Sequence, residues 1–226
     1  MGKEIKVAGI RKIVAERMSE SWHISPRVVY SLSVDMTSTL AYLKTINEGN
    51  EERTLKVNVN HVLIKACAEA MKDFEYVNAS FADNVITVHD HANIGLAVAA
   101  KKGLVVPNIK NAEEKDIKEI AKEMNDLVNR TRVGKVEMDE ITGGTFTITN
   151  LGMMGIENFS PIINQPEVAI LGVDNMVETP VASNGQIVIR PKMNLNFVAD
   201  HRVIDGAYAA QYIGKVKELL ETICYQ

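Results

Sequence analysis

The residues whose types and spacing could carry chemistry stand together near the C-terminus, between Ala199 and Gly206. His201 follows an apolar run and precedes Asp205 by four positions, and Gly206 opens a long amphipathic segment. Because an imidazole is the usual side chain for moving a proton near neutral pH, His201 is a candidate general base at the end of a strand. Taken alone, the same histidine is at least as well explained as a satisfied polar residue at a strand end.

Asp205 has two interpretations. It either helps to orient the imidazole, or it caps the helix that the pattern after Gly206 predicts. Because the glycine-led turn before that helix need not be helical, a spacing of four does not place the carboxylate beside His201. Spacing alone leaves both interpretations open.

A second candidate group closes the stretch from Gly144 to Gly152, where an alternating β-branched run ends. The run predicts a stiff strand, and the hydroxyl of Thr149 at its end would be a fixed donor for an oxyanion opposite a base. A β-branched residue is also simply favoured in a strand. The sequence has no Gly-x-Ser-x-Gly elbow and no cysteine in a reactive setting, so a covalent acyl-enzyme has no obvious nucleophile. These residues therefore indicate direct transfer, with His201 activating a group of the substrate.

Other motifs that carry chemistry are weak or absent from the sequence. There is no phosphate loop and no dinucleotide-binding fingerprint. His89 and His91 flank Asp90, but two histidines at this spacing need further metal ligands, and no cluster of Cys or Glu residues supplies them. We therefore expect a solvated turn here and no metal site.

Apolar periodicity and turn residues predict one domain that mixes helices with a large sheet. Helices are expected over 9–22, 35–46, 60–71 with Asn60 as the cap, after a capping box of Asn111 and Glu114, and from Gly206 on. Strands are expected over 27–34, 85–88, 93–99, 104–107, 145–149, 167–173 and 186–198. Asn184-Gly185 is typical of a two-residue hairpin turn.

The composition sets wide limits on function. Of the 226 residues, 46% are apolar and 24% are charged, which is ordinary for a globular protein. A net charge of -4 gives no electrostatic case for binding nucleic acid or an anionic membrane, and no apolar run reaches the roughly 18 residues of a membrane span. Cys67 and Cys224 lie in helical patterns and are expected to be buried free thiols in a reducing compartment, so a cytoplasmic location is expected.

The two glycine-punctuated stretches resemble the signatures of a known family. Asp200 to Ala207 is similar to the active-site signature of the dihydrolipoamide acyltransferases, the core components of 2-oxo acid dehydrogenase complexes, and Gly144 to Gly152 is similar to the second signature. The stretches 9–18, 103–107 and 166–172 also match, in the family's order. The resemblance implies the fold of chloramphenicol acetyltransferases, an α/β two-layer sandwich of helices on a large mixed sheet. Those enzymes carry a second histidine where this chain has Asp200.

The resemblance also implies a mechanism, in which an acyl group moves between dihydrolipoamide and coenzyme A. His201 would take the proton from a thiol, and the thiolate would attack the thioester carbonyl directly. Thr149 stands at the position of the family's oxyanion-binding Ser or Thr. Asp205 would hold the architecture of the site by pairing with an arginine, for which Arg11 and Arg17 are both candidates.

The family's assembly gives further expectations. Its active site lies between two subunits of a homotrimer, with the histidine from one and the hydroxyl from the other, and trimers build cubic or icosahedral cores. The lipoyl group is carried on a separate domain, and 2-oxo acid dehydrogenase and dihydrolipoamide dehydrogenase are partners. No lipoyl or subunit-binding domain is recognised here, so residues 1–226 are expected to form a single catalytic domain. The phosphates of coenzyme A imply lysines near the channel, and Lys135 is a weak candidate that a solvated helix end explains as well.

Two other function classes remain open. A structural core or binding protein without chemistry is disfavoured because His201 and Thr149 are both present, and a thioester assay separates the two. A chloramphenicol-type acetyltransferase that acylates a small alcohol is disfavoured by Asp200, and a screen of acceptors tests it. The motifs do not distinguish acetyl, succinyl and branched-chain acyl groups, or a cubic from an icosahedral core.

Overall fold

The structure is a computed structural model that describes residues 2–50, 52, 55–100 and 103–223. The helices are α1 (Ile10–Ile24), α2 (Thr37–Ile46), α3 (Val59–Met71), α4 (Ile117–Val133) and α5 (Gly206–Thr222), with short 3-10 helices η2 (Glu75–Asn78), η3 (Ala112–Glu114) and η4 (Gly152–Met154). The strands are β1 (Arg27–Asp35), β2 (Ala79–Ala82), β3 (Val85–Val88), β4 (Ile94–Leu96), β5 (Val98–Ala100), β6 (Gly103–Val105), β7 (Asn108–Ile109), β8 (Phe146–Asn150), β9 (Ala169–Ser183) and β10 (Gln186–Asp200).

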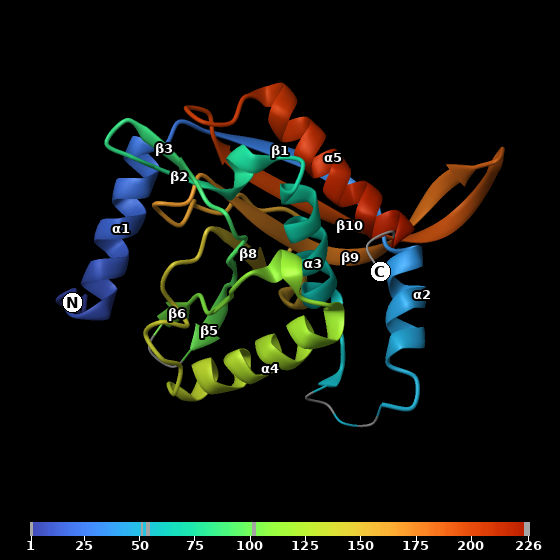
Figure 1. The fold of residues 1–226 in the computed structure, drawn as a ribbon, viewed down its shortest axis with the longest axis horizontal. Coiled ribbons are helices and arrows are strands. Elements are labelled where there is room, and N and C mark those ends of the chain that lie inside the picture. The colour runs from blue at the N-terminus through green and yellow to red at the C-terminus, as the bar shows by residue number, and fades with distance from the viewer. Residues whose placement is uncertain (1, 51, 53–54, 101–102, 224–226) are drawn as a thin grey trace.

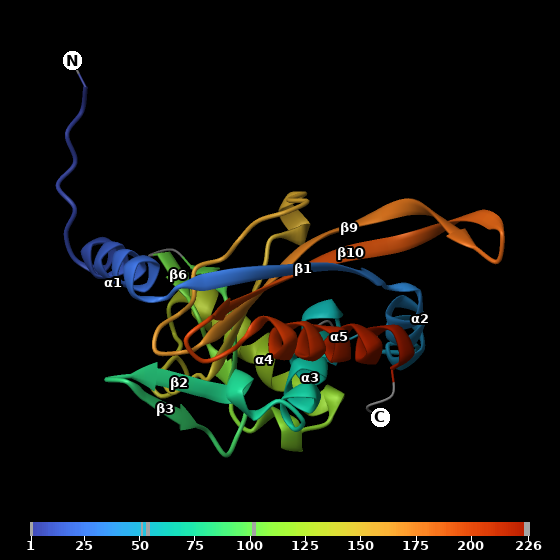
Figure 2. The same cartoon turned by 90° about the horizontal axis from the view of Figure 1, so that it is seen from above.

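The main sheet has the strand order β1-β10-β9-β8-β4-β7. Its β1, β10 and β9 run antiparallel, β9 pairs parallel with β8 and β8 with β4, and β7 closes the far edge antiparallel. Helices α3, α4 and α5 cover one face of this sheet, as Figures 1 and 2 show. The predicted two-layer α/β sandwich with a large mixed sheet is therefore confirmed.

The core lies between the sheet and these helices because each central strand alternates its side chains between the two faces. Phe146 on β8 and Phe197 on β10 point to the helical side and meet the buried ring of Tyr212 on α5, with ring centroids 6.3 Å and 5.0 Å from it. The opposite face of the same strands carries Thr147 and Thr149 on β8. The segment 156–168 crosses this second face, where buried Ile163 packs in a small apolar cluster with residues of β9 and β10.

The hairpin turn lies where the sequence predicts it, and a glycine ends the longest helix. Asn184 and Gly185 both have left-handed backbone angles, φ 50° and 76°, and join β9 to β10 in a long hairpin that projects from the body (Figure 1). Gly134 ends α4 with φ 75°. Both turns need positive φ, which explains why glycine and asparagine occupy them.

The predicted capping box of Asn111 and Glu114 is wrong. Asn111 is left-handed, its N–H bonds the Asn93 side chain, and only the short η3 follows before extended backbone at Lys115. The long helix begins a few residues later, where Asp116 accepts from the N–H groups of Lys118 and Glu119 and forms the actual box. Asn111 with Glu114 and Asp116 with Glu119 have the same spacing of a cap residue and a glutamate three positions later. Only the second pair caps a helix, because the backbone of Asn111 is bonded to Asn93 instead.

Two smaller expectations also change. The predicted strand over 93–99 is two strands, β4 in the main sheet and β5 in a separate hairpin with β6. Helix α3 is capped by Asn58, which exchanges hydrogen bonds with His61, and not by Asn60. Cys67 is a buried free thiol, whereas Cys224 lies outside the described residues.

Helix α1 forms as predicted, but it stands apart from the core. Its apolar residues Ile13, Val14, Trp22 and Ile24 are all exposed in the single subunit. Figure 2 shows the N-terminal segment extending away from the body beyond this helix. The apolar face of α1 therefore has no cover within the described part of one chain. Within the described ranges, no helix combines the length and the apolar character that crossing a membrane requires.

Candidate active site

The backbone around His201 is held rigidly while its side chain stays exposed. Strand β10 ends at Asp200, and the N–H of His201 donates to the carbonyl of Pro26, 2.9 Å away. The carboxylate of Asp200 is buried and accepts from the guanidinium of Arg202 at 2.6 Å, and that guanidinium lies over the ring of Phe81. The exposed imidazole on this fixed turn is accessible to a ligand or to another protein chain.

Asp205 is the N-cap of α5. Its Oδ1 accepts from the N–H of Tyr208 at 2.9 Å, which satisfies one of the free donors at the start of the helix. No ion pair joins Asp205 to Arg11 or Arg17 in the described part of one chain. Of the two interpretations left open by spacing, the geometry favours the cap over the helper of His201.

Replacing Asp205 with alanine is expected to lower the free energy of unfolding by about 1 kcal/mol, because the first turn of α5 loses its cap. In an Asp205→Asn variant the amide oxygen still accepts the hydrogen bond, so both stability and kcat should stay close to wild type. Thermal unfolding and steady-state kinetics measure the two quantities. If Asp205 relayed a proton instead, the asparagine variant would fold normally and lose kcat.

Thr149 lies near the end of β8 on the face away from the helices. It pairs with Gly172 of β9 and is half-buried. Its hydroxyl makes no hydrogen bond to another residue that the structure describes. A side chain at position 172 would crowd Phe159 and Pro161, since an added Cβ would lie 3.1–3.3 Å from their atoms. The hydroxyl is therefore an unused donor next to Gly172, against which the side chains of Phe159 and Pro161 pack closely.

His201 and Thr149 do not meet within one chain. The strand registers align Thr149 with Gly172 and Gly172 with Asn196, so two strand spacings separate the threonine from β10. His201 lies beyond Asn196 along the direction of β10, which places the backbones of the two residues roughly 19 Å apart, from about 3.3 Å per residue and about 4.8 Å per strand. A base and an oxyanion donor must both lie within hydrogen-bond reach of one reacting group. Within one chain, His201 and Thr149 therefore cannot act together on one reacting group.

Lys135, the weak candidate for coenzyme A, follows the C-cap of α4. Its backbone N–H bonds the carbonyl of Arg130, and its side chain is exposed. Among the described residues it contacts neither His201 nor Thr149, so one chain gives it no link to the candidate site.

His89 and His91 have different partners, and the expectation that no cluster of Glu residues lies beside them is wrong. His89 lies against Ser80, 3.2 Å from its hydroxyl, while His91 hydrogen-bonds Glu113 at 2.7 Å. That bond raises the pKa of His91, and Glu114 completes a group of three side chains whose ligand atoms lie within 4.8 Å of one another. No local pattern reveals this group, because more than twenty positions separate His91 from the glutamates.

Two buried carboxyl groups on the Thr149 face were missed in the sequence. Glu167 is 3% exposed, and burial raises its pKa to about 8. Asp174 is 2% exposed; burial raises its pKa, and it accepts from Asn196 at 2.9 Å. The available signal was an acidic residue inside an apolar strand pattern, which requires either a partner or a neutral state.

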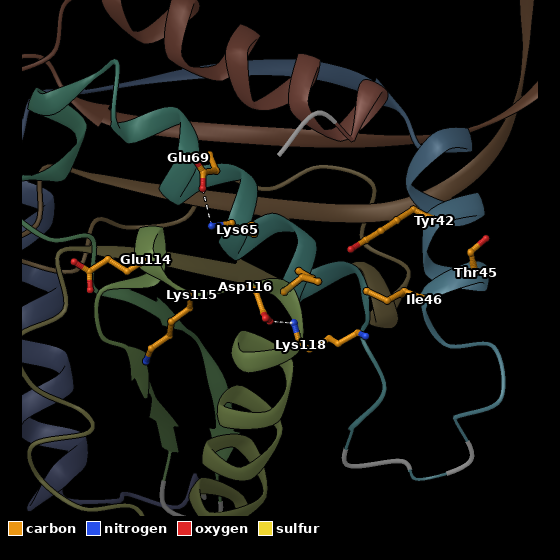
Figure 3. Close-up of a pocket in the computed structure, with 10 residues that line it drawn as sticks. Tyr42, Thr45, Ile46, Lys65, Glu69, Glu114, Lys115, Asp116 and Lys118 are labelled. Atoms are coloured by element: carbon orange, nitrogen blue, oxygen red, sulfur yellow. Dashed lines mark hydrogen bonds and ion pairs between the residues drawn. The ribbon is translucent and has the colours of Figure 1, made fainter. Parts of the chain in front are cut away.

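Two cavities of the described chain lie away from Thr149, which lines neither of them. A cavity of about 820 Å³ lies between α2, α3 and the start of α4, lined by residues such as Tyr42, Lys65 and Asp116 (Figure 3). Charged side chains that line this cavity form ion pairs with each other, such as Lys65 with Glu69 at 2.6 Å. A smaller cavity of about 370 Å³ lies between α1, β2 and residues 164–166, and includes Phe81, on which Arg202 packs beside His201.

A model of the catalytic domain of the 2-oxoacid dehydrogenase acyltransferases matches residues 2–224. The chain is 40% identical to the lipoamide acyltransferase component of a branched-chain alpha-keto acid dehydrogenase complex from Bacillus subtilis, over 98% of this chain and 53% of that protein. It is 37% identical to the dihydrolipoyllysine-residue acetyltransferase component of a pyruvate dehydrogenase complex from Rickettsia felis, over 94% of this chain and 52% of the relative. The chain thus spans about half the length of these curated relatives.

Solved structures of acyltransferases from this family are also similar to this chain. A dihydrolipoamide acetyltransferase from Azotobacter vinelandii, studied for the roles of a serine, a histidine and an asparagine in its catalytic mechanism, is 34% identical with a TM-score of 0.94, covering 99% of this chain and 93% of that one. The cubic core of a pyruvate dehydrogenase multienzyme complex is 33% identical with a TM-score of 0.93, over 99% and 93% of the two chains. A chloramphenicol acetyltransferase shares the fold at 12% identity, with a TM-score of 0.56 over 97% of this chain and 100% of the other.

Proposed function

This chain belongs to the 2-oxoacid dehydrogenase acyltransferase family, and from that premise we propose that it transfers an acyl group between dihydrolipoamide and coenzyme A at a site shared by two subunits. The observation that carries the proposal is the pair of separated half-sites. One chain presents an exposed imidazole on a fixed turn and, on a backbone roughly 19 Å away, an unused hydroxyl on a fixed strand. In a symmetric oligomer the imidazole of one copy meets the hydroxyl of the next.

The proposed reaction needs no covalent enzyme intermediate. His201 takes the proton from the attacking thiol, and the thiolate adds to the thioester carbonyl to give a tetrahedral oxyanion. Thr149 of the adjacent copy donates its hydroxyl hydrogen bond to that oxyanion, where the negative charge develops. The intermediate then collapses, the second sulfur leaves, and the imidazolium returns the proton to it.

The spacing of the named residues in a relative supports these roles. In the enzyme from Azotobacter vinelandii, as many positions separate the serine from the histidine as separate Thr149 from His201 here. Its asparagine follows the histidine by four positions, as Asp205 does. Serine and threonine both supply a hydroxyl, and asparagine and aspartate both cap a helix, so the substitutions preserve the proposed functions.

We further propose the assembly and the partners. Residues 1–226 act as one catalytic domain that forms a homotrimer, and the exposed apolar face of α1 supplies surface for contacts between copies. Trimers build a larger core, as in the cubic core among the relatives. The lipoyl group reaches the site from a separate domain, coenzyme A enters as a substrate, and 2-oxo acid dehydrogenase and dihydrolipoamide dehydrogenase act before and after the transfer.

The acyl group is best identified by a direct comparison of rates. Relatives that act in acetyl and in branched-chain systems match this chain at similar identity. The experiment incubates the assembled protein with dihydrolipoamide and acetyl-, isobutyryl- or succinyl-coenzyme A and follows thioester formation. We expect turnover with at least one donor. Absence of transfer from all three would contradict the proposal and favour a structural core without chemistry.

A further inference from the structure

We propose that Glu167 is a positioning residue, which holds β8 and the adjoining segment so that the hydroxyl of Thr149 stays where the acyl transfer needs it. The inference rests on the proposed function, because it presumes that Thr149 binds the oxyanion. Glu167 lies near the end of the segment 156–168 that crosses the Thr149 face, two residues before β9 begins. Its side chain takes no part in the proton transfer.

The contacts of Glu167 form a closed triangle. Thr147 of β8 donates its hydroxyl to Oε1 of Glu167 at 2.9 Å, and the Asn164 amide donates to the same oxygen at 2.9 Å. Asn164 also donates to the Thr147 hydroxyl at 3.3 Å. Two chain segments are therefore joined at one carboxyl group: strand β8, through Thr147, and the segment 156–168 that covers this face, which carries both Asn164 and Glu167.

Thr149 is the next residue of β8 on the same face as Thr147, because side chains alternate along a strand. The segment anchored through Asn164 also borders Thr149 on its other side, since Phe159 and Pro161 pack at Gly172, its partner on β9. If these three side chains shifted, both strand β8, which carries the Thr149 hydroxyl, and the adjoining segment with Phe159 and Pro161 would move. Displacements of about 1 Å can cost on the order of 10²-fold in rate.

The surroundings of Glu167 favour a neutral carboxyl group. Its Oε2 is buried and has no partner among the described residues, and the groups that face it are the Thr147 hydroxyl and the Asn164 amide. No ion pair to Glu167 lies in the described ranges, so an ionised form would lack a cation in a dry site. Burial accordingly raises its pKa to about 8. Ionisation above that pH puts an uncompensated charge into the triangle.

A double-mutant cycle on kcat tests whether Glu167 acts through Thr149. Glu167→Ala is expected to lower kcat about 10-fold with little change in KM for either substrate. In a Thr149→Val background the same substitution should add less than about 3-fold, because the hydroxyl that it positions is already gone. If the two losses multiply in full, Glu167 does not act through Thr149 and the inference is overturned. If Thr149→Val alone keeps the wild-type kcat, the proposed function fails as well.

If Glu167→Ala folds poorly, the isosteric variant Glu167→Gln tests the same role of Glu167. Because Glu167 ionises above about pH 8, the wild-type kcat should fall there. Glutamine accepts the same two hydrogen bonds and cannot ionise, so Glu167→Gln should have a kcat near wild type at pH 7 and should not show this alkaline fall. Asp174→Asn is the matched control, because it neutralises the other buried carboxyl on this face, which contacts β10 instead of β8. It should retain the alkaline fall. An unchanged alkaline fall in Glu167→Gln would overturn the inference.

Thermal unfolding of the same variants checks the charge state separately. The folded-state pKa of about 8 lies above the ordinary value of 4.5, so the folded protein binds the proton more tightly than the unfolded chain. The contribution of Glu167 to stability is then present at low pH and is lost as pH rises from 4.5 to about 8. Glu167→Gln should therefore raise Tm at pH 8 and leave a flatter profile. Equal profiles for both proteins would contradict a neutral Glu167.

Discussion

Replacing His201 with alanine is expected to lower kcat by roughly 10²–10⁴, the usual contribution of a general base. The imidazole is exposed, and its backbone is fixed through Pro26 and the buried Asp200, so removing it should not disturb the fold. A free cysteine thiol has a pKa of about 8.5, so most of a similar substrate thiol is protonated at neutral pH and would then have to lose its proton to water. Steady-state kinetics with dihydrolipoamide and the preferred acyl donor measure the loss.

His89→Ala is the matched control for this experiment. His89 lies on a turn far from His201 in the sequence, and its ring rests against the Ser80 hydroxyl, so its removal should leave kcat near wild type. A wild-type kcat in His201→Ala would remove this residue from the reaction.

Thr149→Val is expected to lower kcat on the order of 10²-fold, as the loss of one oxyanion donor does in other enzymes. Valine keeps the shape and the strand preference of threonine and removes only the hydroxyl. KM should change little, because the hydrogen bond forms to the charge of the tetrahedral intermediate and not to the bound thioester.

Thr149→Ser retains the hydroxyl and should keep kcat within a few-fold of wild type. The contrast between serine and valine at one position separates the hydrogen bond from packing, since both substitutions alter the side chain at the same half-buried site. Equal losses in the two variants, or a loss that appears only in KM, would argue for a packing or binding role.

Much of the fold followed from local patterns. The alternation of Thr145 to Thr149 predicted β8, Asn184-Gly185 predicted the hairpin, and the apolar spacing after Gly206 predicted α5. These features depend on backbone preferences of neighbouring residues, which a sequence displays directly.

The secondary-structure predictions were wrong where contacts with residues distant in the sequence outweigh the conformational preference of the local sequence. Asn111 has the spacing of a helix cap, but its backbone bonds the side chain of Asn93, which lies eighteen positions away. The apolar run after Asn93 continues as one pattern, but Leu96 and Val98 belong to different sheets. The exposure of the α1 apolar face could not be predicted either, because periodicity shows that a helix has an apolar face and not what covers it.

The candidate site was predictable in part. His201 and Thr149 stood out because each closes a strand before a glycine-marked turn, and Asp205 proved to be the helix cap that one of its interpretations required. Glu167 did not stand out, because its partners Thr147 and Asn164 approach it only in the folded chain. The separation of the two half-sites also required strand register, which no local pattern contains.

The central claim is that one catalytic site takes His201 and Thr149 from different copies, and mixed assemblies test it most directly. The experiment co-expresses His201→Ala and Thr149→Val chains with different tags and purifies assemblies that contain both. With random mixing, about a quarter of the sites combine an intact histidine with an intact threonine, because each comes from one of two neighbours. We expect the mixed assembly to recover about a quarter of wild-type activity, against roughly 1% or less for each variant alone. A mixed assembly as inactive as the single variants would contradict the shared site.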